Sequence, residues 1–129
     1  MVTKIKSGNK IFALIIDLSS IKEGAFPITD PSWPLQLLLM KRKQGHVVAK
    51  HMHKKIRKIS KQPQEAIVVI KGAIEASIFD RKGKIIAKKN ISSGQCLLIV
   101  DGAHEVKIIK NALIYAFKDG PYVEDKISL

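Results

Sequence analysis

The chain has 129 residues, which is enough for one domain with a hydrophobic core and too few for two ordinary domains. Hydrophobic residues make up 46% and charged residues 26%, a composition that excludes an intrinsically disordered chain. The formal net charge of +12 indicates an anionic partner: nucleic acid, acidic lipid, or a small phosphorylated or carboxylated ligand. Solvated surface lysines without a partner are the alternative.

The single cysteine and the short apolar runs indicate the compartment. Cys96 cannot form an internal disulfide, and its apolar surroundings predict a small buried residue rather than a nucleophile. Residues 11–16 are apolar but too short for a signal-peptide core or a membrane span. We therefore expect a cytoplasmic protein with no membrane partner.

Short apolar runs separated by turn residues predict strands along most of the chain. Three prolines near residues 27–34 indicate an irregular connection, and the short basic stretch 54–60 predicts a loop or one helical turn. Eight to ten short strands are typical of an all-β, antiparallel sandwich or barrel. The expected strands are residues 2–6, 10–17, 35–41, 46–52, 66–70, 74–79, 84–89, 96–99, 105–109 and 113–117.

Two histidines and an acidic residue form the first candidate site. His51 and His53 are two residues apart, so in a strand both imidazoles point to the same side and can converge on one cation. Two histidines in a lysine-rich loop are otherwise solvated. Gly45 precedes His51 with five residues between them, and Glu65 precedes Gly72 with six; an apolar strand further on ends in the sequence Asp-Gly-Ala-His at His104.

This order of residues resembles the cupin superfamily, whose first motif is G-x5-H-x-H-x3-4-E-x6-G and whose second motif ends in a third histidine. The resemblance implies a single cupin domain over residues 1–129, a double-stranded β-helix or jelly-roll barrel. Within it, residues 1–34 form N-terminal strands and a connection, 35–118 the barrel and 119–129 a C-terminal tail.

The resemblance also implies a metal site. Inside the barrel, His51, His53, Glu65 and His104 would bind one divalent ion. Eleven residues separate His53 from Glu65, more than the motif has, so Gln64 is the alternative fourth ligand. Such nitrogen and oxygen donors suit Zn, Fe, Mn, Ni or Co. A purely structural or vestigial site is the alternative.

The C-terminal segment carries a second resemblance. The sequence Lys118-Asp-Gly-Pro-Tyr122, followed by Asp125-Lys126, is similar to a closing motif of small cupin-fold metalloproteins linked to surface-polysaccharide biosynthesis. A bend at Gly120-Pro121 would bring Tyr122 and Lys126 over a barrel mouth, where Tyr122 could act as an acid or hydroxyl donor. In the alternative, Tyr122 covers apolar surface and Lys126 pairs with a neighbouring acid.

A basic run surrounds the two histidines and extends beyond them. It would attract an anionic substrate, and Arg57 could bind a phosphate or carboxylate through two hydrogen bonds. The run contains no aromatic residue for base stacking, so a nucleic-acid partner is not expected. A solvated loop is the alternative. The run consists of Lys50, Lys54, Lys55, Arg57, Lys58 and Lys61.

Three functions are compatible with these residues. The first is a metal-dependent enzyme, of the sugar isomerase or epimerase type, acting on a carbohydrate or sugar nucleotide. Glu65 and Tyr122 would move protons, while Arg57, Lys118 and Lys126 would bind the anionic substrate. The second is a module that binds or senses a small anionic ligand, and the third is an iron-dependent, oxygen-using cupin. We also expect a homodimer formed through the hairpin at residues 2–17.

Overall fold

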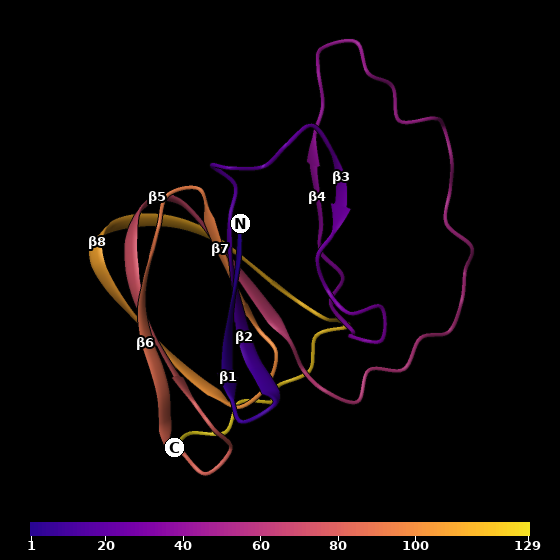
Figure 1. Ribbon diagram of the computed structural model, residues 1–129. Helices are drawn as coiled ribbons and strands as arrows, with labels where there is room; N and C mark the ends of the chain where they lie inside the picture. Colours follow the sequence, from indigo (N-terminus) through magenta and orange to yellow (C-terminus); the bar gives the residue numbers. More distant parts are fainter.

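The protein is built from strands alone. The computed structural model describes all 129 residues and contains eight strands and no helix (Figure 1). In chain order the strands are β1 (Val2–Ser7), β2 (Lys10–Asp17), β3 (Gly24–Pro27), β4 (Leu38–Lys41), β5 (Glu65–Phe79), β6 (Ile85–Ser92), β7 (Gln95–Ile99) and β8 (Ala103–Lys118). The prediction of an antiparallel all-β protein is confirmed.

Strand β5 organises the main sheet. Its first half pairs with β7 and its second half with β6, while β8 pairs along its other edge. Strands β2 and β1 continue the sheet beyond β7, and β3 and β4 form a separate two-stranded sheet. Figure 1 shows the six-stranded sheet curled into a half-barrel, with the β3–β4 hairpin to one side.

Two turn signals in the sequence mark bends rather than chain reversals. The expected strands 66–70 and 74–79 are joined in β5, and 105–109 and 113–117 are joined in β8. Gly72 adopts φ +81°, and a Cβ at this position would lie 2.0 Å from the carbonyl oxygen of Asn111. Because only glycine tolerates both conditions, β5 can bend at Gly72 while it stays paired with β8.

One expected strand does not form, and one strand was not expected. Residues 42–64 contain neither helix nor strand, so the prediction of a strand at 46–52 is wrong for this structure. In Figure 1 these residues extend away from the half-barrel, on the side opposite β8. Residues Gly24–Pro27, where no strand was predicted, pair with Leu38–Lys41 as β3 and β4.

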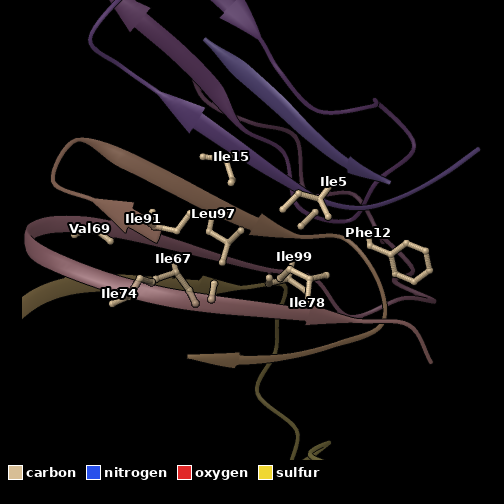
Figure 2. Close-up of a cluster of buried hydrophobic side chains, with 12 residues drawn as sticks. Ile5, Phe12, Ile15, Ile67, Val69, Ile74, Ile78, Ile91, Leu97 and Ile99 are labelled. Atoms are coloured by element: carbon tan, nitrogen blue, oxygen red, sulfur yellow. The ribbon is translucent and has the colours of Figure 1, made fainter. Parts of the chain in front are cut away.

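Strands β2, β5 and β7 bury apolar side chains on both faces of the sheet. Alternate residues, such as Leu97 and Ile99, point into the half-barrel and form an interior cluster of twelve residues (Figure 2). The intervening residues, such as Cys96 and Leu98, belong to a second cluster that residues around β3 and β4 cover. Burial on both faces explains why these strands are continuously apolar, and Cys96 is buried as predicted.

Asp101 connects three turns at one end of the half-barrel. Its carboxylate forms ion pairs with Lys10 and Arg81 and accepts a hydrogen bond from the Gly102 N–H (2.7 Å). Burial raises the pKa of Asp101, but the hydrogen bonds from Lys10 and Gly102 and the two positive charges together lower it below its ordinary value. The charged form of Asp101 therefore stabilises the fold.

We predict that Asp101→Asn lowers the free energy of unfolding by about 1–3 kcal/mol at pH 7, because it removes charge-assisted hydrogen bonds. Lys10 and Arg81 are more than half exposed, which favours the lower part of that range. The folded pKa is below the ordinary 3.8, so this contribution is present above pH 3.8 and is lost as the pH falls through the folded value.

The measurement is urea unfolding at pH 7 and pH 3. The difference between wild type and Asp101→Asn should shrink at pH 3. Asp125→Asn, in the tail, is the control. Equal unfolding curves for wild type and Asp101→Asn at pH 7 would contradict this role of Asp101.

Candidate functional site

Two of the predicted ligands lie together inside the half-barrel. Glu65 begins β5 and His104 is the second residue of β8. The Nε2 atom of His104 lies 3.9 Å from the Oε2 atom of Glu65, with side chains 30% and 26% exposed. Glu65 lies on the same face of β5 as Ile67 of the interior cluster, and His104 on the same face of β8 as Val106, which packs against that cluster.

The curl of the sheet creates this contact. In the β5–β8 pairing, His104 is opposite Ile78, which is thirteen residues after Glu65. A straight strand would separate these positions by about 43 Å, at roughly 3.3 Å per residue. The bend in β5 brings its two ends close enough for the side chains to meet.

His51 and His53 lie elsewhere. Both are exposed, in the connecting segment (residues 42–64), with ring centroids 5.2 Å apart. A ring nitrogen of His51 is 2.8 Å from the Ala49 carbonyl oxygen. No three His, Cys, Asp or Glu side chains gather into a group that could hold a metal ion. In a single chain, the four predicted ligands thus form two separate pairs and do not fit a four-ligand site.

The side chain of Gln64, the alternative ligand, forms hydrogen bonds with backbone groups. It is 3% exposed. Its Oε1 atom accepts a hydrogen bond from the Leu35 N–H (3.3 Å), and its Nε2 group donates to the Val100 carbonyl (3.5 Å). The Gln64 amide therefore anchors the start of β5 to neighbouring segments.

A basic groove lies near the start of β5 and the end of β8. Lys118, at the end of β8, is opposite Glu65 in the strand register. The groove that Lys118 borders has a volume of about 490 Å³. Its lining comes from the end of the connecting segment and from the tail: Lys58, Ser60, Lys61, Pro63, Lys118, Asp119, Gly120, Pro121, Tyr122, Val123 and Asp125.

The tail residues are oriented by hydrogen bonds among themselves. Tyr122 is 79% exposed, and its hydroxyl donates to the Glu124 carboxylate (3.0 Å). This bond, with one from the Lys126 N–H, lowers the pKa of Glu124. The Lys118 ammonium lies 5.8 Å from the Tyr122 ring centre and 3.7 Å from an Asp125 carboxylate oxygen.

The remaining predicted substrate-binding residues lie outside the groove. Arg57 and Lys126 are both exposed, and neither lines it. Lys58 and Lys61, which the sequence identified only as members of the basic run, line it instead.

Asp119 joins the connecting segment to the tail. Its carboxylate accepts hydrogen bonds from the Ser60 hydroxyl (2.7 Å) and the Gln64 N–H (2.7 Å). The sequence indicated Asp119 only as a turn residue, because its partners lie more than fifty residues away. It holds the two walls of the groove together.

Comparisons with protein-family models, curated proteins and solved structures found no match for this chain. The fold also provides no helix of the length and apolarity that crossing a membrane requires.

We predict that Asp119→Ala releases the connecting segment from the tail. Without the carboxylate, Ser60 and the Gln64 N–H lose their partner, so trypsin should cleave after Lys58 and Lys61 several times faster than in wild type. Limited proteolysis followed by mass spectrometry measures these rates.

The matched control is Asp80→Ala, which removes a carboxylate that accepts hydrogen bonds within the β5–β6 turn. It should leave cleavage after Lys58 and Lys61 unchanged. Equal rates for wild type and Asp119→Ala would show that Asp119 does not hold the segment.

Proposed function

We propose that the protein is a metal-binding barrel of the cupin type that binds an anionic carbohydrate, such as a sugar nucleotide. The observation that carries this proposal is the contact between Glu65 and His104, with Lys118 of a lysine-lined groove opposite Glu65 in the strand register. The pair offers one oxygen and one nitrogen donor, and the groove offers positive charge.

Glu65 and His104 are suited to divalent transition metals. Imidazole and carboxylate are ligands of zinc, iron, manganese and nickel, and these two side chains already face each other inside the half-barrel. Partial burial limits competition from bulk water. Two donors make a weak site, so tight binding requires further ligands, for which His51 and His53 are the predicted source.

The groove suits a phosphorylated sugar. Lys58, Lys61 and Lys118 can each donate to phosphate oxygens, and the net charge of +12 attracts anions at a distance. The Tyr122 hydroxyl and ring can contact a sugar. A second hollow of about 380 Å³, which shares Ser60 and Lys61 with the groove, includes Trp33, which offers a flat apolar surface.

The two residues proposed for proton transfer, Glu65 and Tyr122, lie in different parts of the structure. Glu65 faces the interior, and Tyr122 borders the groove with its hydroxyl bonded to Glu124. This arrangement supports the binding of a ligand more directly than its turnover, because Glu65 does not line the groove that Tyr122 borders. Isomerisation or epimerisation of the bound sugar stays a prediction.

We predict that the wild-type protein binds Zn²⁺ or Co²⁺ and that Glu65→Gln and His104→Ala each weaken the affinity at least about tenfold, because the first removes the negative charge of the oxygen donor and the second removes the nitrogen donor. Isothermal titration calorimetry measures the affinity, and the Co²⁺ absorption spectrum reports the ligand environment. Glu105→Gln, one residue from His104 and on the opposite face of β8, is the control. Unchanged affinity in both site variants would contradict the proposal.

We predict that Lys118→Met and Lys61→Met each weaken binding of UDP-glucose by about 10–100-fold, the effect of losing one charge-assisted hydrogen bond. Binding should weaken further as salt is raised. Titration calorimetry with UDP-glucose, UDP and uridine separates the phosphate contribution from that of the base. Lys82→Met, in a turn away from the groove, should bind like wild type; equal losses in all three variants would indicate a general charge effect and no specific groove.

A further inference from the structure

The connecting segment has the amino-acid composition of a β-strand, but it pairs with no strand. Residues 47–63 take part in no backbone–backbone hydrogen bond. Several large apolar side chains alternate with lysines in this stretch and are 59–91% exposed: Val47, Val48, Met52, Ile56 and Ile59. A segment of this composition is stabilised when it adds to a sheet edge, which satisfies the backbone and covers the apolar side chains.

Strand β8 offers such an edge. It pairs with β5 on one side only, over sixteen residues. Ile108 lies opposite the fully buried Ile74 and on the same face, yet it is 52% exposed. The interior of the half-barrel is therefore open along β8. The other free edges of the main sheet, on β1 and β6, carry exposed lysines.

We propose that residues 46–51 of a second copy of the chain add to the free edge of β8 as an antiparallel strand, and that the two copies exchange these segments reciprocally. In one register, His51 is opposite His104 on the interior face. Apolar residues then meet apolar residues on that face, and an acid meets a base on the other. The interior pairs are Val47 with Ile108 and Ala49 with Val106, and the outer pair is Lys50 with Glu105.

Neighbouring registers are less favourable. Moving the segment by two residues in one direction places Lys50 opposite Lys107, two like charges that repel. Moving it by two in the other direction places Val48 opposite Glu105 and leaves Ile108 without its apolar partner. The register with His51 opposite His104 therefore covers Ile108 with an apolar residue and also pairs Lys50 with Glu105.

The partner is a second copy because the structure fixes both ends of the segment in its own chain. Leu39 of β4 is buried in the covered cluster, and Ser60 and Gln64 are bound to Asp119. Between these anchors the segment extends away from its own β8 (Figure 1). A copy related by a two-fold axis can receive it there and donate its own segment in return, a closed exchange.

This exchange would complete the metal site and so rests on the proposed function for that consequence. His51 and His53 of one copy would join Glu65 and His104 of the other. A single chain contains two pairs of ligands, and the dimer would contain two sites of four.

A disulfide test does not depend on metal. In a Cys96→Ala background, Val48→Cys with Lys107→Cys places two outward-facing cysteines opposite each other across the proposed pairing. Oxidation at low micromolar concentration should give a covalent dimer on a non-reducing gel. A monomer with an internal disulfide would overturn the exchange, and the absence of any disulfide would overturn the proposed register. Val48→Cys with Lys82→Cys, a turn position, is the control and should stay unlinked.

Complementation then tests the site. His51→Ala/His53→Ala lacks one pair of ligands, and Glu65→Gln/His104→Ala lacks the other. Refolded together in equal amounts, they should recover about a quarter of the wild-type Co²⁺ sites, because half of the dimers are mixed and each has one complete site. Covalent dimers without recovery would retain the exchange and contradict the proposed metal site; recovery without covalent dimers would overturn the proposed register.

Discussion

The bend of β5 at Gly72 is the constraint on which the rest of the structure depends. Without it, Glu65 and His104 would lie at opposite ends of a long ladder, and the sheet would be open and twisted rather than curled into a half-barrel. The close approach of the Asn111 carbonyl excludes any side chain at position 72, so β5 and β8 bend together. This paired bend creates the interior, positions Lys118 opposite Glu65, and leaves the outer edge of β8 free.

Much of the fold could be predicted from the sequence because most strands carry their own pattern. The hairpin of β1 and β2 follows from the turn at Gly8, and the continuously apolar β7 follows from burial on both faces. The sequence could not distinguish a bend from a reversal at Gly72, because glycine with positive φ serves both. Residues 46–52 were predicted as a strand from local composition, but strand formation also needs an edge to pair with.

The sequence predicted individual residues of the candidate site but not which of them lie together. The motif spacing identified Glu65 and His104, and the structure places them 3.9 Å apart. The same spacing grouped His51 and His53 with them, and here the single chain separates the two pairs. Lys58, Lys61 and Asp119 form the groove through contacts between residues distant in sequence, and no local pattern encodes such contacts.

The lysines of the connecting segment serve two physical purposes at once. An exposed run of Val, Met and Ile with strand character would aggregate edge to edge, and interspersed charges oppose this. Like charges also repel an identical segment of another chain, so segments do not pair with each other. In the proposed exchange, Glu105 on β8 would attract the segment where Lys107 would repel it, so charge would restrict the segment to one register of one edge. Two further cations, Lys58 and Lys61, are held near Lys118 by Asp119, where the proposed anionic ligand would relieve their repulsion. In these proposals, excess positive charge would favour both a bound anion and a specific strand partner.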